Sequence, residues 1–176
     1  KLDTLILQAK NNLPQQFDEK QLVELIKING ENKFSKLYKS FEDKFRGSNQ
    51  EIKNRLSIYL AFLNQYKDDT SALILDIGCG RGEWLELLKE NNLKAIGIDN
   101  NPNILDSISQ DFNIKQADAL AYLKSQEDSS LSVITGFHII EHIPFDMVLE
   151  ILEQSLRVLK TGGMIIFETP NPRNIL

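Results

Sequence analysis

A glycine-rich turn between an apolar strand and an amphipathic helix constrains this chain more than any other feature. Residues 76–82 read Asp-Ile-Gly-Cys-Gly-Arg-Gly, with glycine at every second position. Glycines lack a Cβ, so they let the backbone turn sharply and approach a ligand closely. The helix expected next carries the apolar residues Trp84, Leu85, Leu87 and Leu88. We therefore expect a first βα turn that forms a nucleotide-type pocket at the carboxyl end of its strand.

From residue 72 onward, short apolar runs alternate with amphipathic helices. This alternation is typical of repeated βα units that build a parallel sheet. We expect strands over 73–77, 94–98, 114–117, 131–137 and 164–168, with helices that begin near Gly82, Pro102, Asp118 and Pro144. Right-handed crossovers between these strands predict an α/β fold with a doubly wound, mostly parallel sheet.

Residues 1–70 contain no convincing strand. Apolar residues recur there at helical spacing in three stretches, within 22–29, 34–45 and 52–66. We therefore expect an N-terminal helical cap over 1–70, followed by a ligand-binding core over 71–176.

Composition and charge exclude several classes of function. The chain has 176 residues, 41% of them hydrophobic, and no window of 18 uninterrupted apolar residues or secretory signal, so we expect a cytoplasmic protein without a transmembrane segment. One cysteine and two histidines cannot build a disulfide or a zinc cage, and we expect no metal. Residues 71–176 carry 8 basic and 15 acidic side chains, whereas binding to phosphates needs clustered Lys and Arg. We therefore expect no nucleic-acid partner.

Acidic residues follow the second and third expected strands. Asp99 closes the run Ile-Gly-Ile-Asp at 96–99, where a carboxylate can accept hydrogen bonds from the ribose hydroxyls of an adenosine ligand. Asp118 would then face the adenine amino group, although an aspartate after a strand is about as often a helix N-cap. A dinucleotide site would have glycine where Glu83 stands. An acidic side chain at the opening of the pocket that this turn forms suits a ligand with an ammonium group.

Five segments, taken in order, resemble the motifs of class I S-adenosylmethionine-dependent methyltransferases. They are the turn at 76–82, Gly-Ile-Asp at 97–99, Ala-Asp-Ala at 117–119, Phe-His-Ile-Ile-Glu-His at 137–142 and Leu-Arg-Val-Leu-Lys-Thr-Gly-Gly at 156–163. The resemblance implies S-adenosyl-L-methionine as the cofactor, and it assigns a part of this donor to each matching residue. Asp76, Gly78 and Gly80 would surround the methionine portion, Asp99 the ribose, Asn100 one face of the adenine, and Asp118 with Ala119 its edge.

Two further segments are similar to methyltransferase domains found with bacterial glycosyltransferases and O-antigen polysaccharide modifiers. These are 45–56, which contains Phe-Arg-Gly-Ser, and Glu-Thr-Pro-Asn-Pro at 168–172. The similarity implies a role in polysaccharide biosynthesis, with a hydroxyl or terminal phosphate of a saccharide or small molecule as the acceptor. The fold normally continues with an antiparallel hairpin after the fifth strand, whereas this sequence stops at Leu176. We therefore expect the C-terminal strands to be absent and a partner domain to cover the exposed sheet edge.

The donor's carboxylate needs a cation. Arg46 and Arg55 are the candidates in the cap, since a guanidinium can hold a carboxylate through two parallel hydrogen bonds. The resemblance makes Arg55 the closer match. The alternative is that both are surface arginines paired with neighbouring acids.

His138 follows the fourth expected strand, and the resemblance places it near the sulfonium and the incoming acceptor. It can act as a general base on an acceptor hydroxyl, or it can be a packing residue. Glu141 and His142 can shape the donor pocket or, less readily, hold a metal. Two other functions stay open, a non-catalytic S-adenosylmethionine-binding module and an NAD-dependent oxidoreductase.

Overall fold

The core of the molecule is a five-stranded parallel sheet. The structure is a computed structural model, and it describes residues 47–102 and 112–171. The strands lie in the order β3-β2-β1-β4-β5, and every neighbouring pair runs parallel. Their bounds are β1 Ile74–Ile77, β2 Ala95–Asp99, β3 Ile114–Gln116, β4 Leu131–Phe137 and β5 Leu159–Glu168. Because the chain steps outward from β1 in both directions, the doubly wound α/β fold predicted from the alternating pattern is confirmed.

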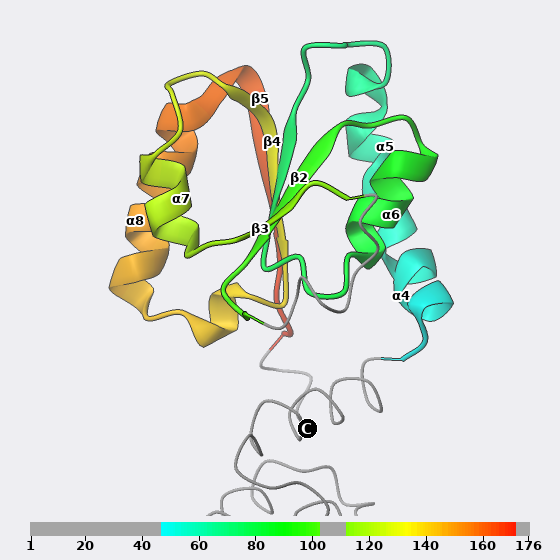
Figure 1. Ribbon diagram of the computed structural model, residues 1–176, viewed down its shortest axis with the longest axis horizontal. Coiled ribbons are helices and arrows are strands. Elements are labelled where there is room, and N and C mark those ends of the chain that lie inside the picture. Colours follow the sequence, from blue (N-terminus) through cyan, green and yellow to red (C-terminus); the bar gives the residue numbers. More distant parts are fainter. Residues whose placement is uncertain (1–46, 103–111, 172–176) are drawn as a thin grey trace, which may run out of the picture. The chain divides into compact units, whose positions relative to one another are not determined.

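Helices cover both faces of this sheet (Figure 1). One face carries α4 (Asn49–Leu56), the short helices η1 (Ser57–Tyr59), α5 (Leu60–Leu63) and η2 (Asn64–Tyr66), and α6 (Glu83–Glu90). The other carries α7 (Ala119–Lys124) and α8 (Phe145–Val158), and η3 (Ile140–His142) links β4 to α8. Within 47–102 and 112–171, no helix is long and apolar enough to cross a membrane.

Two apolar layers result from the alternation of side chains along each strand. Ile74 of β1 packs with Trp84 of α6 and Leu63 of α5, whereas the next residue, Leu75, packs with Leu123 of α7 on the opposite face. β1 is therefore buried on both sides, as a central parallel strand should be.

The expected elements match the described ones closely, with one informative difference. β5 begins at Leu159, five residues earlier than predicted, because Leu159 pairs with Leu131 before the register shifts and Met164 pairs with Val133. The extra residues of this irregularity include Gly162, whose φ is +82°. The helix expected near Pro102 falls largely outside the described residues.

The part of the expected cap that the structure describes packs directly on the sheet. Ile52 and Leu56 of α4 and Leu63 of α5 are buried in the same layer as Trp84 and Phe137. The two earlier helical stretches, within 22–29 and 34–45, lie outside the described residues. The division at residue 70 stays a prediction.

Candidate active site

The glycine-rich turn joins β1 to α6 and is tied to the neighbouring strand β2. The backbone N–H groups of Gly78 and Cys79 both donate to the carbonyl oxygen of Ile98, at 2.8 and 3.0 Å. Gly78 has a φ of +70° and Gly80 a φ of +52°, which are left-handed values that favour glycine. A Cβ on Gly78 would lie 2.5 Å from a methyl carbon of Ile139. The turn therefore depends on glycine for its conformation, and a Cβ at Gly78 would also displace the end of the Ile139 side chain.

Asp99 closes the same edge of the sheet from the end of β2. Its carboxylate accepts the backbone N–H of Gly80 on Oδ2 at 3.1 Å and that of Asn101 on Oδ1 at 2.8 Å. The glycine turn and the acidic residue at the end of β2, predicted separately from the sequence, thus meet through a hydrogen bond. Each carboxylate oxygen can accept a further bond, so Asp99 keeps the capacity to bind hydroxyl groups.

Asp76 lies beneath the turn and is 2% exposed. Its Oδ1 accepts the hydroxyl of Thr135 at 2.7 Å, and the Thr135 oxygen in turn accepts the indole N–H of Trp84 at 3.1 Å. Trp84 is buried and packs edge-on to Phe137, with the ring centroids 5.2 Å apart. Thr135 could not be predicted as a partner of Asp76, because in the sequence it is only one hydroxyl within the apolar run of β4. This chain of bonds orients the Asp76 carboxylate from inside the protein.

Asp118 and Ala119 begin α7 beside the end of β2. The N–H of Ala117 donates to the carbonyl oxygen of Asp99 at 3.0 Å, which brings the start of α7 to the same edge. Asp118 is the N-cap of α7, and its Oδ1 accepts the N–H of Ala121 at 2.9 Å. The N-cap alternative is therefore realised, while contact with an adenine stays a prediction. Asn100, next to Asp99, is exposed at this edge.

His138 stands at the carboxyl end of β4 with a left-handed backbone, at φ +57°. Its N–H donates to the carbonyl oxygen of Glu168 at 2.8 Å. Its half-exposed ring lies between two carboxylates: Nε2 is 3.3 Å from Oε1 of Glu168, and Nδ1 is 3.5 Å from Oε1 of Glu141. A left-handed conformation at a residue other than glycine persists only where its surroundings hold it, and such residues cluster at active sites.

Glu168 and Glu141 are each held by a hydroxyl. The phenol of Tyr59 donates to Oε2 of Glu168 at 2.5 Å, and the Thr169 hydroxyl donates to Oε2 of Glu141 at 3.0 Å. The bond to Glu168, aided by burial and by the carboxylate charge, raises the pKa of Tyr59 to about 12. Sequence reasoning missed Tyr59 and Glu168 as neighbours of His138, because Tyr59 fits an apolar helical stripe 79 positions earlier in the chain.

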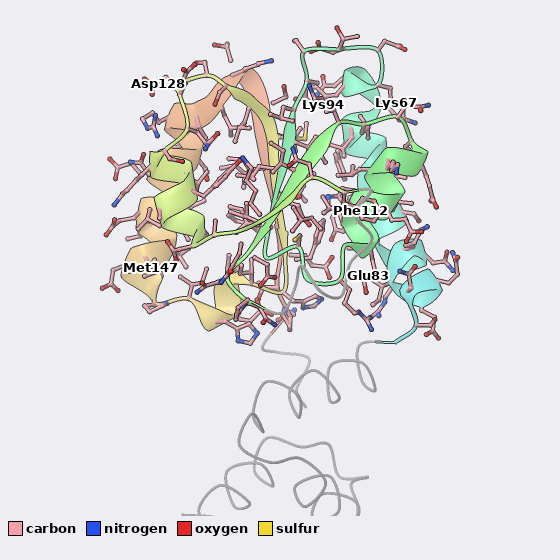
Figure 2. The ribbon with its side chains drawn as sticks, in the orientation of Figure 1. Lys67, Glu83, Lys94, Phe112, Asp128 and Met147 are labelled. Atoms are coloured by element: carbon pink, nitrogen blue, oxygen red, sulfur yellow. The ribbon has the colours of Figure 1, made fainter. Side chains whose placement is uncertain are left out.

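The acid at the third-glycine position is not open to a ligand. Figure 2 shows Glu83 at the end of α6 nearest the turn, opposite the end of the sheet where Lys94 lies. Its side chain is 1% exposed, and it accepts the Nε–H of Arg81 at 2.7 Å. The expectation of an accessible acid for an ammonium group at this position is therefore wrong, because the carboxylate is buried under the turn and neutralised by Arg81.

The two arginines predicted to hold a carboxylate differ in what the structure shows of them. Arg46 lies outside the described residues. Arg55 is exposed in the last turn of α4. Lys53, two residues earlier, is buried, and its Nζ lies 2.5 Å from Glu90 and 3.5 Å from Glu86 of α6. The bond with Glu90 raises the pKa of Lys53, and the pair fixes α4, with Arg55, against the helix that follows the glycine turn.

Thiol chemistry finds little support at this edge. In the part of the chain that the structure describes, no group of three or more His, Cys, Asp or Glu residues is arranged to hold a metal ion. Burial, together with the neighbouring Asp76 and Asp99, strongly raises the pKa of the Cys79 thiol. A thiol that resists ionisation is a poor nucleophile, so Cys79 serves as a small side chain within the turn.

Comparisons with known proteins agree with this geometry. A family profile described as "Methyltransferase domain" matches residues 48–174. The tRNA N(3)-methylcytidine methyltransferase trm140 of Schizosaccharomyces pombe is 31% identical over 144 residues, which cover 71% of this chain and 47% of that protein. The ubiquinone biosynthesis O-methyltransferase of Idiomarina loihiensis is 30% identical over 128 residues, covering 67% of this chain and 50% of that protein. The chain thus spans about half the length of these relatives.

Among solved structures, a SAM dependent methyltransferase from Archaeoglobus fulgidus superposes with a TM-score of 0.70 and 38% sequence identity. The superposition covers 77% of this chain and 59% of that one. The PH0226 protein from Pyrococcus horikoshii OT3 superposes with a TM-score of 0.60 at 21% identity, which shows the shared fold alone.

Proposed function

This chain belongs to the class I S-adenosylmethionine-dependent methyltransferases, and on that premise we propose that it transfers a methyl group from S-adenosylmethionine to an acceptor hydroxyl. The observation that carries the proposal is the bond between the Gly80 amide and the Asp99 carboxylate, within the segment that the family profile matches. This bond joins two motifs that the family resemblance assigns to a single ligand.

The residues present fit the proposed donor. Gly78 provides a backbone without a Cβ, and Asp99 offers spare acceptor capacity for ribose hydroxyls. By the family resemblance, Asn100, Asp118 and Ala119 would contact the adenine that extends from that ribose. When bound, S-adenosylmethionine supplies a methyl carbon that the adjacent sulfonium already activates.

The chain's own residues would mainly position the two partners and accept a proton. Holding two reactants in the correct geometry is a large contribution to the rate of a displacement reaction. We assign His138 as the group that accepts the hydroxyl proton, because it is half exposed at the end of β4 and a neutral imidazole is a suitable base. Mutagenesis of such bases typically reveals a contribution of about 10²- to 10⁴-fold in rate.

The charges around His138 favour a neutral acceptor. Glu141 and Glu168 lie within 3.5 Å of its ring, so a phosphate brought to the same place would meet two carboxylates. Relatives that are named O-methyltransferases support an oxygen atom as the acceptor. We propose a saccharide hydroxyl, which follows from the resemblance of segments 45–56 and 168–172 to polysaccharide-linked domains.

A transfer RNA acceptor is the main competing possibility, because trm140 acts on tRNA. The net charge of −7 over residues 71–176 disfavours a polyanion. We therefore propose that this chain and trm140 use the same methyl donor but methylate different acceptors.

The experiment that tests this function follows a labelled methyl group. The purified chain is incubated with methyl-labelled S-adenosylmethionine and, separately, with a set of oligosaccharides, phosphorylated oligosaccharides and bulk tRNA. We expect label in the neutral oligosaccharides, at a rate that falls at least about a hundredfold in His138→Ala. Label in tRNA alone would overturn the acceptor, and binding of the donor without transfer to any acceptor would favour a non-catalytic binding module.

A further inference from the structure

His138 is held by a second group that the sequence did not connect with it. Glu168 bridges His138 and Tyr59: Oε1 faces the histidine Nε2 at 3.3 Å, and Oε2 accepts the tyrosine hydroxyl at 2.5 Å. These residues come from three elements, η1, the end of β4 and the end of β5. We propose that Glu168, anchored by Tyr59, is a positioning residue that orients His138 as the proton acceptor. This inference rests on the proposed function.

The main chain supports the same orientation. Phe137 pairs with Glu168 across β4 and β5, and the next N–H, that of His138, donates to the Glu168 carbonyl oxygen at 2.8 Å. Glu168 therefore contacts His138 through both its backbone and its side chain. The left-handed backbone of His138 is a strained state that these contacts can maintain.

This arrangement distinguishes the two ring nitrogens. A neutral imidazole carries one N–H and one lone pair, and a carboxylate can only accept a hydrogen bond. In the tautomer that carries its proton on Nε2, the ring nitrogen 3.3 Å from Glu168 Oε1, the lone pair is on Nδ1. When the acceptor oxygen bonds the methyl carbon, the carbon–sulfur bond breaks with its electron pair left on sulfur, and the hydroxyl proton passes to Nδ1. Glu168 then faces the positive charge that forms on the ring, as carboxylates do behind other catalytic histidines.

Glu141 is the competing partner. Among the described residues, Glu141 on η3 and Glu168 on β5 face the ring, and Tyr59 on η1 lies behind Glu168. Glu141 faces Nδ1, at the longer distance of 3.5 Å, and within the described residues no backbone hydrogen bond joins it to His138. Glu168 is therefore the better candidate for the orienting role.

The test follows the His138 ring directly by NMR in the full chain. The chain has two histidines, His138 and His142, so His142→Gln assigns both sets of ring signals. Each ring is titrated in the unsubstituted chain and in Glu168→Gln, Glu141→Gln and Glu127→Gln. Glu127 is an exposed glutamate before β4 and serves as the matched control.

We expect the titration midpoint of His138 to move to lower pH in Glu168→Gln, because an opposite charge within about 4 to 6 Å favours the protonated ring. The movement should be smaller in Glu141→Gln and absent in Glu127→Gln. Glu168→Asp, which keeps the charge on a shorter side chain, should fall between the unsubstituted chain and Glu168→Gln, and it also serves if Glu168→Gln does not fold. An unmoved midpoint in the folded Glu168 variants, or an equal movement in Glu141→Gln, would overturn the positioning role.

Titration of the same unsubstituted sample with S-adenosylmethionine distinguishes a failure of the positioning role from a failure of the proposed function. If the donor does not bind, the proposed function fails and the role of Glu168 fails with it. If the donor binds and His138 does not respond to Glu168, only the positioning role is overturned.

Discussion

At the scale of single residues, the site depends on backbone groups that side chains hold in place. Asp99 accepts two backbone N–H groups, from Gly80 and Asn101, and so fixes both the glycine turn and the start of the following loop. Thr135 fixes Asp76 in a similar way from inside the protein. The residues assigned to the ligand therefore also shape the edge of the sheet, and substitutions at them should affect binding and local structure together.

Replacing Asp99 with Ala should weaken S-adenosylmethionine binding. The ribose hydroxyls would lose their acceptor in a partly buried site, at a cost of about 1 to 3 kcal/mol. Calorimetry on the purified variant measures the loss, and circular dichroism checks that the fold persists. Donor affinity equal to that of the unsubstituted chain would remove Asp99 from the site.

Two glycines with left-handed backbones provide a matched pair. A Cβ on Gly78 would meet Ile139 at 2.5 Å, whereas a Cβ on Gly162 has nothing within 4 Å, and their φ values are +70° and +82°. Both alanine variants should lose about 1 to 2 kcal/mol of unfolding free energy through backbone strain, and Gly78→Ala should lose more because of the added contact. Urea unfolding measures the difference. Equal losses would show that the space at Gly78 is not limiting.

Arg55 tests the predicted contact with the donor carboxylate. Arg55→Lys keeps the charge but loses the planar guanidinium that can hold a carboxylate through two hydrogen bonds. It should therefore weaken the binding of S-adenosylmethionine much more than that of adenosine, which has no carboxylate. Arg46→Lys should do the same to a smaller degree. Binding of both ligands is compared by calorimetry. Losses that are equal for the two ligands, or no loss, would return both arginines to a surface role.

At the scale of elements, the strands were predictable because each is an apolar run. β4 matches its predicted range, 131–137, β1 begins one residue later than predicted, and β2 is shifted by one residue at both ends. The register irregularity in β5 could not be predicted, since it depends on how Leu159 and Met164 pair with β4. Contacts between elements that lie far apart in the sequence could not be predicted either. Tyr59 fits an apolar stripe, and only the folded chain brings it to Glu168.

The contact between η1 and β5 has a pH signature. The pKa of Tyr59 is raised from its ordinary value of 10 to about 12, so its bond to Glu168 stabilises the fold fully below pH 10. This contribution is lost as the pH rises through 10 to 12, where the unfolded chain releases the proton more readily than the folded one. The unfolding free energy should therefore fall less over this range in Tyr59→Phe than in the unsubstituted chain. Parallel pH profiles for the two proteins would contradict the assignment.

At the scale of the whole molecule, the carboxyl ends of three strands form the edge of the sheet that holds the candidate site. The glycine turn, Asp99 and His138 lie at the carboxyl ends of β1, β2 and β4, respectively. The ion pair of Lys53 with Glu90 joins α4 to α6. The chain order of the strands made this edge predictable, because ligands bind where the strand order reverses. β5 is the outer strand of the described sheet, and its coverage by a partner domain stays a prediction.

The proposed function depends first on the binding of S-adenosylmethionine at this edge. The most direct measurement is calorimetric titration of the full chain with S-adenosylmethionine, S-adenosylhomocysteine and NAD under one set of conditions. We predict saturable binding of the first two with one site per chain and no binding of NAD, because the turn has Glu83 where a dinucleotide site needs glycine. Binding of NAD, or the absence of binding by S-adenosylmethionine and S-adenosylhomocysteine, would contradict the account.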